Sequence, residues 1–122
     1  MTRKILDDSQ LHPSIREQVR HYQQQVITEV HSAVAAHRIT VVGMATNPYC
    51  KKARQALTAA GLSFHYLEYG SYVSKWRERG ALKMWTGWPT FPMVFVNGSL
   101  IGGYTDLKRL LDSGALSGAL QK

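Results

Sequence analysis

The segment MVFVNGSLIGG, residues 93–103, limits the possible folds of this chain more than any other stretch. Two apolar runs flank Asn97-Gly98, a dipeptide favoured in a type I′ turn because both of its central positions take positive φ angles. The pattern therefore predicts a β-hairpin. The fold must contain an antiparallel pair of strands toward its C-terminal end.

A second pair of strands is predicted upstream of the hairpin. The β-branched run RITVVGM, residues 38–44, is typical of a buried strand, and LSFHYLEY, residues 62–69, predicts another. Between them a helix is expected from Pro48 to about Ala60, where Gly61 ends it. A strand, a helix and a second strand in this order form a parallel pair through a crossover. Together with the hairpin, the crossover predicts one mixed four-stranded sheet.

Helices are predicted before and after these strands as well. Apolar residues recur at helical spacing from Pro13 to about Ala36, which predicts one long amphipathic helix behind a loose tail of residues 1–12. Further helices are predicted over residues 72–85 and over residues 105–114. One predicted helix therefore precedes the first strand, and another follows the last strand.

The predicted order is one helix followed by β-α-β-α-β-β-α, which is the element order of the thioredoxin fold with an extra helix in front. We expect an α/β architecture with helices on both faces of a mixed four-stranded sheet. Residues 1–37 are expected to form an N-terminal tail and helix, and residues 38–122 the domain. The sequence leaves open whether that helix packs on the domain or mediates a dimer, and it does not give the oligomeric state.

Length and cysteine count exclude several classes of protein. The chain has 122 residues, the size of one domain, and contains no apolar run long enough for a transmembrane helix. Its single cysteine excludes an internal disulfide and a zinc site built mainly from thiolates. The five histidines lack the spacing of a helical metal site, so no bound metal is expected. The start MTRKILDDSQ lacks the apolar region of a signal peptide, and a cytoplasmic location is expected by default.

The charge balance is basic, with fifteen Lys and Arg against eight Asp and Glu and a formal net charge of +7. Two clusters hold many of the cations: Lys51, Lys52 and Arg54, and Lys75, Arg77, Arg79 and Lys83. Such clusters are typical of a solvated surface, or of a site for nucleic acid, an acidic partner or a small anionic ligand. Because the sequence contains no nucleic-acid-binding motif, we do not expect nucleic acid to be the partner.

Three separated segments, in the correct order, resemble a glutaredoxin. NPYCKKARQALTAAG resembles the Cys-Pro-Tyr-Cys site of that family and the helix behind it. GWPTFPMVFVNGSLIGG resembles the Trp-Pro-Thr-x-Pro stretch, hairpin and double glycine, particularly those of the monothiol, CGFS-type branch. YTDLKRLLDSGAL resembles the last helix. The likeness covers about residues 38–120, and the first 37 residues have no clear counterpart.

The resemblance implies a groove that binds glutathione. Pro92 corresponds to a cis-proline of the family, and the backbone of Phe91 is expected to pair with the cysteinyl part of glutathione. After the double glycine Gly102-Gly103, a helix start is expected to hold the γ-glutamyl end, because its free N–H groups attract a carboxylate. The residues implied for that end are Gly103, Tyr104, Thr105 and Asp106. Arg79 corresponds to an arginine that pairs with the glycine carboxylate.

The sequence departs from the family at the residues that perform catalysis. Glutaredoxins attack disulfides with the first cysteine of the site, and Asn47 stands at that position. Cys50 stands at the second position, which resolves mixed disulfides but does not start the reaction. Met44 replaces a lysine that favours the thiolate. Because asparagine followed by Pro48 makes a sound helix start, Asn47 is interpreted as a redox site rebuilt as an N-cap.

Two functions from different classes follow from these departures. The first is a glutathione-dependent thiol–disulfide oxidoreductase with weak or lost activity, in which any thiol chemistry rests on an exposed Cys50 of lowered pKa. The second is a non-catalytic module that binds glutathione, a glutathionylated protein or another protein. An iron–sulfur cluster is disfavoured, because Asn47 replaces the cysteine that would ligate it. The sequence does not show whether Cys50 is exposed, and it does not identify the partner.

Overall fold

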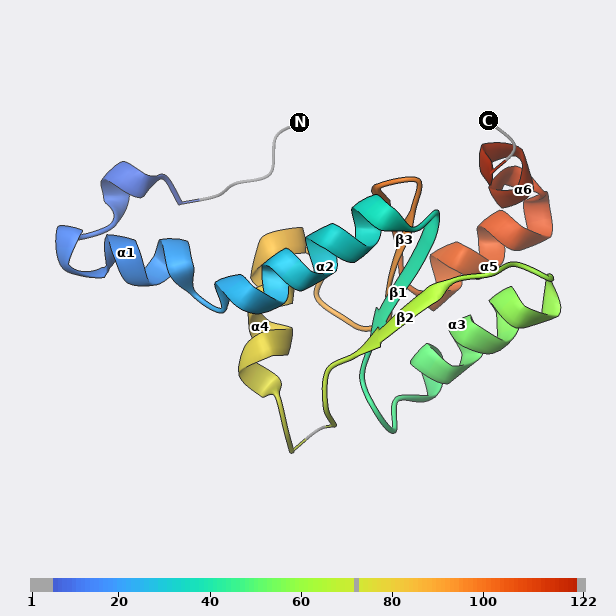
Figure 1. Ribbon diagram of the computed structural model, residues 1–122, viewed down its shortest axis with the longest axis horizontal. Helices are drawn as coiled ribbons and strands as arrows, with labels where there is room; N and C mark the ends of the chain where they lie inside the picture. The colour runs from blue at the N-terminus through green and yellow to red at the C-terminus, as the bar shows by residue number, and fades with distance from the viewer. Residues whose placement is uncertain (1–5, 72, 121–122) are drawn as a thin grey trace.

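Strand β1 (Ile39–Gly43) lies inside the sheet and is buried at every residue. The structure, a computed structural model, describes residues 6–71 and 73–120 of the chain. The strand order β2-β1-β3-β4 forms one mixed sheet with helices on both faces (Figure 1). The predicted thioredoxin-like fold, with a mixed four-stranded sheet and additional helix at the front, is confirmed.

The strands pair as the predicted crossover and hairpin require. The other three strands are β2 (His65–Glu68), β3 (Met93–Val96) and β4 (Ser99–Gly102). β1 pairs in parallel with β2, with Val41 opposite Tyr66, and pairs antiparallel with β3. Asn97 and Gly98 close the β3–β4 hairpin with φ angles of 50° and 85°, as the Asn-Gly turn predicts.

Helices cover the sheet through two apolar clusters, one on each face. The helices of the described chain are α1 (Pro13–His21), α2 (Gln24–Ala36), α3 (Pro48–Ala59), α4 (Trp76–Thr86), α5 (Tyr104–Ser113) and α6 (Ala115–Leu120), and a 3₁₀ turn, η1, spans Asp8–Gln10. On one face Val42, Met93 and Phe95 pack against α2 and α4. The second cluster, shared with α3, α5 and α6, consists of Ile39, Val41, Ala53, Leu57, Val94, Val96, Leu107 and Leu116. Successive residues of β1 thus serve opposite faces of the sheet.

The prediction of one long helix over residues 13–36 is wrong. The structure has two helices, and the chain breaks between them at Tyr22 and Gln23, where Gln23 takes a left-handed backbone with φ 48°. The interval from Tyr22 to Val26 keeps helical spacing, so the apolar periodicity carries no sign of the break. Packing explains the difference, because α2 buries Val26 and Val30 against the sheet whereas α1 buries none of its residues. α1 extends away from the body of the molecule (Figure 1).

Other boundaries differ by a few residues. β2 is shorter than the predicted strand 62–69, and α4 begins at Trp76 where the prediction began the helix at residue 72. Residue 72 itself and residues 1–5 of the predicted tail lie outside the described residues. α6 follows Gly114 and was not predicted.

Helix α2 belongs to the same apolar core as the sheet. Val26 and Val30 share one cluster with Val42 of β1 and Met93 of β3. The N-terminal helical region therefore packs on the domain through its second half. The division of the chain at residues 37 and 38 stays a prediction.

Two further findings concern the helices and the ligating side chains. No helix in the described part of the chain combines the length and the apolar character needed to cross a bilayer. Within residues 6–71 and 73–120, no three His, Cys, Asp or Glu side chains gather in an arrangement suited to a metal ion.

Candidate functional site

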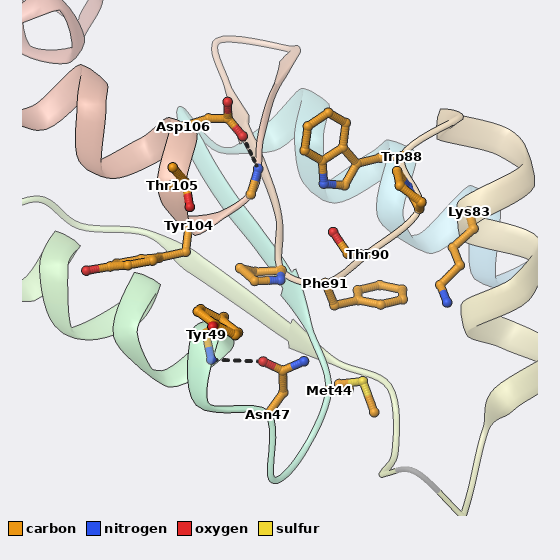
Figure 2. Close-up of a pocket in the computed structure, with 13 residues that line it drawn as sticks. Met44, Asn47, Tyr49, Lys83, Trp88, Thr90, Phe91, Tyr104, Thr105 and Asp106 are labelled. Carbon is orange, nitrogen blue, oxygen red and sulfur yellow. Dashed lines mark hydrogen bonds between the residues drawn. The ribbon is translucent and has the colours of Figure 1, made fainter.

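A groove opens at the edge of the sheet where β1 ends and β3 begins (Figure 2). Its volume is about 490 Å³, within the roughly 300–1,000 Å³ of small-molecule sites. The lining residues are Met44, Asn47, Tyr49, Lys83, Trp88, Pro89, Thr90, Phe91, Pro92, Gly103, Tyr104, Thr105 and Asp106. The starts of α3 and α5 form two walls, and α4 and the loop before β3 complete the groove.

One wall is the start of α3, which Asn47 caps. The Asn47 Oδ1 atom accepts hydrogen bonds from the backbone N–H groups of Tyr49 and Cys50, at 2.9 and 3.2 Å. Pro48 follows as the first helical residue, where its missing N–H leaves no hydrogen bond unmade. The predicted N-cap is therefore confirmed, and it satisfies two of the N–H groups that a helix start leaves unpaired.

The same two contacts fix the direction of the Asn47 amide. Because Oδ1 faces the helix, Nδ2 points the other way, away from α3 (Figure 2), and Asn47 lines the groove. An amide nitrogen donates hydrogen bonds, but it does not act as the nucleophile of a disulfide exchange. At this position the groove therefore offers a hydrogen-bond donor and no thiol.

The opposite wall is the start of α5, directly after the double glycine. Gly102 has φ 118°, and a Cβ atom there would lie 2.3 Å from Asp106 Oδ2, so the position requires glycine. The Gly103 N–H donates a hydrogen bond to the same Asp106 oxygen at 3.0 Å. Tyr104 and Thr105 line the groove beside them. Since first-turn N–H groups lack partners within a helix and carry partial positive charge, this wall is suited to an anionic group.

The floor of the groove is the loop that precedes β3. The Phe91–Pro92 peptide bond is cis in the structure. The Phe91 side chain is buried in the core cluster shared with α2 and α4, and this burial anchors the loop. Thr90 contributes a hydroxyl to the lining, and Trp88 lies beside Gly103. The loop thus joins the α4 side of the groove to the α5 side.

Arg79 is not brought into the groove. Its side chain is 7% exposed, and its guanidinium donates hydrogen bonds to the backbone carbonyls of Tyr69 and Ser74, at 2.9 and 2.5 Å. A buried guanidinium needs such acceptors, and these two carbonyls supply them. The predicted contact between Arg79 and a ligand carboxylate is therefore not available in this arrangement. One helical turn further along α4, Lys83 lines the groove instead, with Nζ 5.8 Å from the centre of the Phe91 ring.

Cys50 lies behind the groove and does not line it. Its side chain is completely buried, with 0% exposure. A Cβ atom on Gly43 would lie 2.9 Å from the Cys50 sulfur, so the thiol packs directly against the end of β1. An exposed Cys50, which the oxidoreductase hypothesis requires, is contradicted by this packing.

The protonation of Cys50 leads to the same conclusion. Burial raises the pKa of the Cys50 thiol above its ordinary value of 9.0, and a backbone hydrogen bond with Met44 and the charge of Arg54 offset this effect only in part. Since the thiolate is the nucleophilic form, a raised pKa and a closed surface both suppress reactivity. The interpretation of Cys50 as a candidate catalytic residue is not supported.

The structure gathers most of the predicted ligand-binding residues and adds others. Phe91, Pro92, Gly103, Tyr104, Thr105 and Asp106 line one groove together with Asn47. The lining residues that the sequence analysis did not assign to the ligand site include Lys83, Tyr49 and Thr90. Lys83 follows Arg79 by four residues, so helical spacing places both on one side of α4 and was a signal for it.

Comparisons with known proteins agree with this fold. The family model described as glutaredoxin matches residues 39–101. A glutaredoxin-like protein of Dictyostelium discoideum is 46% identical over 104 residues, which cover 85% of this chain and 85% of that protein. The fold is that of a thioredoxin-like protein, with a groove at the end of β1. The chain belongs to the glutaredoxin family.

Solved structures place the same fold in that family. Oxidized glutaredoxin 2 from Chlamydomonas reinhardtii matches with a TM-score of 0.69 and 32% identity, over 81% of this chain and 94% of that one. A buckwheat glutaredoxin–glutathione complex matches with a TM-score of 0.72 over 86% of this chain and 92% of that one. Its identity of 23% supports a shared fold alone.

The cap predicts a stability effect at Asn47. Replacing Asn47 by Ala removes the acceptor of two N–H groups, and we expect a loss of about 1 kcal/mol in the free energy of unfolding. Asn47→Asp retains an acceptor and is expected to stay within a few tenths of wild type. Urea denaturation of the three proteins measures the difference. Equal stability of Asn47→Ala and wild type would show that the cap contributes nothing.

The burial of Cys50 predicts a thiol that reacts only when the protein opens. We expect negligible alkylation by iodoacetamide in native buffer at neutral pH and rapid alkylation in urea, followed by intact mass. Because the folded-state pKa is raised, the neutral thiol supports the fold fully below about pH 9 and this support is lost as the pH rises further. An Asn47→Cys protein is the control, since its thiol at the open helix start should react without denaturant. Fast native alkylation at Cys50 itself would contradict the buried position.

Proposed function

We propose that this protein binds the glutathionyl group in the groove between α3 and α5 and does not perform thiol–disulfide exchange. The observation that carries the proposal is the combination of a complete groove with an amide at the position of the nucleophile. Six of the seven residues predicted to bind glutathione line that groove, and Asn47 lines it as well. In this proposal the protein retains the fold and the glutathione ligand of the thiol–disulfide oxidoreductase family. It lacks the reactive sulfur, because Asn47 stands at the position of the nucleophilic cysteine.

Each part of glutathione has a suitable counterpart in the groove. The γ-glutamyl carboxylate would lie at the start of α5. The backbone N–H groups of Thr105 and Asp106 belong to the positive end of this helix and would donate hydrogen bonds to it. The cysteinyl backbone would lie along Phe91, and the Asn47 Nδ2 donor would face its sulfur. The glycine carboxylate would pair with Lys83, which stands where Arg79 was predicted to act. The buckwheat protein that was solved with glutathione has the same fold, but it is the chemistry of these residues that supports the assignment here.

Redox turnover requires a thiolate that can reach a disulfide, and the groove lacks one. Asn47 donates hydrogen bonds without a nucleophilic atom, and Cys50 is closed off by Gly43 and the core. Met44 is apolar and nearly buried, so it adds no positive charge beside the sulfur. Activity is therefore expected to be weak or absent, and the binding module is preferred over the enzyme.

The groove does not fit an iron–sulfur cluster. Such clusters are held by thiolates, with histidine replacing cysteine in some cases. The chain has one cysteine, and its sulfur is completely buried behind the groove. Asn47, which stands at the position that would have to ligate the iron, offers only an amide.

Finer points of the assignment are proposals as well. The Trp-Pro-Thr-x-Pro stretch from Trp88 to Pro92 supports placing the chain near the monothiol, CGFS-type branch, with Asn-Pro-Tyr-Cys in place of its active-site motif. A glutathionylated protein is a suitable partner, because the groove is open where the sulfur would lie. The cytoplasmic location stays a prediction from the sequence.

Calorimetric titration with reduced glutathione tests the binding. We expect saturable binding to the wild-type protein and, because Lys83 forms an exposed charge pair worth up to about 1 kcal/mol, two- to fivefold weaker binding by Lys83→Gln. Lys75→Gln is the matched control, since Lys75 is an exposed lysine of the same region that does not line the groove. Absence of any binding by the wild type would overturn the proposal.

Restoring the nucleophile tests the second half of the proposal. Asn47→Cys places a thiol at the helix start within an otherwise complete groove, and glutathione-dependent reduction of a small disulfide should rise from background to clear turnover. Adding Met44→Lys should raise turnover further by favouring the thiolate. Cys50→Ser in the same background should leave the rate unchanged. Turnover by the wild type equal to that of Asn47→Cys would show that the asparagine site is not degenerate.

A further inference from the structure

A second hollow lies between α3 and α5, next to the groove. Its volume is about 630 Å³, and its lining residues are Lys52, Gln55, Ala56, Ala59, Ala60, Tyr104, Lys108, Leu111, Asp112 and Ser117. Tyr104 lines both this hollow and the glutathione groove. The two depressions therefore adjoin each other at Tyr104. We call this surface the α3–α5 hollow.

One side of α3 leads from the groove into the hollow. Tyr49, at the mouth of the groove, is followed at helical spacing by Lys52, Ala56 and Ala59. The Lys52 ammonium lies over the rings of both Tyr49 and Tyr104, 5.3 and 6.0 Å from their centres. The alanines have little bulk and leave the path open. From Tyr49 to Ala60 it runs for about 16 Å along the helix, the length of about five extended residues.

Helix α3 is positively charged, and its Lys52 lies on this path. α3 carries Lys51, Lys52 and Arg54 and no acidic residue. Lys51 and Lys52 are exposed, and neither forms an ion pair with a carboxylate in the part of the chain that the structure describes. Arg54 turns inward, with its guanidinium 4.3 Å from the centre of the Tyr66 ring.

The facing helix does not compensate for these cations. On α5, Asp112 accepts a hydrogen bond from Lys108 at 2.8 Å, and Asp106 is held by the Gly103 N–H and lies 3.9 Å from Arg109. Both acidic groups are thus engaged within their own helix. The α3 side retains the unpaired positive charge.

We propose that the α3–α5 hollow receives an acidic polypeptide segment whose cysteine carries the glutathionyl group held in the groove. This inference rests on the proposed function, because the groove must hold the glutathionyl group for the attached chain to reach the hollow. The sulfur faces Asn47 at the start of α3, so the attached polypeptide leaves the groove beside Tyr49. From there it follows α3, and its carboxylates meet Lys52, the cation of α3 that lines the hollow. The length of the path suits a peptide and exceeds that of a small anion.

The test compares three synthetic peptides that carry one S-glutathionylated cysteine between Glu, Gln or Lys residues. Each peptide and free glutathione are titrated into the full-length protein by calorimetry, and each peptide affinity is divided by the affinity for glutathione. This ratio removes any effect on the groove itself. We expect the Glu peptide to bind about three- to tenfold more tightly than the Gln peptide, and the Lys peptide to bind most weakly. The preference should shrink at high salt, because Lys52 is exposed.

Two variants link the preference to the hollow. Lys52→Glu should abolish the preference for the Glu peptide, whereas Arg77→Glu should preserve it, since Arg77 is an exposed cation on α4 that does not line the hollow. Ala59→Phe should fill the hollow at an exposed helix position and weaken all three peptides relative to free glutathione. A single affinity ratio for the three peptides, or a preference that survives Lys52→Glu, would overturn this inference while leaving glutathione binding in place. Failure of the wild type to bind free glutathione would instead overturn the proposed function, and the docking surface with it.

Discussion

Strand β1 is buried along its whole length, and the rest of the structure is arranged around the need to cover it on both faces. α2 and α4 cover one face, and α3, α5 and α6 cover the other. β4 runs parallel to β1, because each is antiparallel to β3, so both strands end at the same edge of the sheet. The helices that follow them, α3 and α5, therefore both begin at this edge. Two positive helix ends consequently face one groove, which suits an anionic tripeptide.

The Asn47 side chain caps the start of α3 but provides no nucleophile there. A helix that begins here needs an acceptor for its first N–H groups, and the Asn47 amide supplies it with hydrogen bonds of 2.9 and 3.2 Å. The helix start and the groove thus persist without the nucleophilic sulfur. What changes is the atom presented to the ligand, which is now an amide nitrogen. Under the proposed function, this member of the glutaredoxin family retains a binding groove without performing the reaction.

The sequence predicted the parts of the fold that depend on local patterns. The Asn97-Gly98 turn, the cap at Asn47 and the strand at residues 38–44 were each visible from neighbouring residues, and the structure contains all three. The break at Gln23 was not visible, because the helical spacing of apolar residues continues through it. Only the structure shows that α2 packs on the sheet whereas α1 buries none of its residues. The sequence also did not show that Lys83, and not Arg79, lines the groove. This depends on the backbone carbonyls to which the buried Arg79 guanidinium donates its hydrogen bonds.

The sequence by itself determined the family, the order of the four strands and the presence of Asn47 before Pro48, because these reside in residue identity and spacing. It could not decide whether the remaining cysteine is reactive. Reactivity depends on whether the Cys50 sulfur is exposed. Only the packing of α3 on β1 brings this sulfur against Gly43 and buries it. The tertiary structure also joined the groove to the α3–α5 hollow through Tyr104. Which side chains are exposed, and which surfaces lie side by side, depends on how all the helices pack on the sheet. That packing is driven by the burial of apolar surface over the whole core.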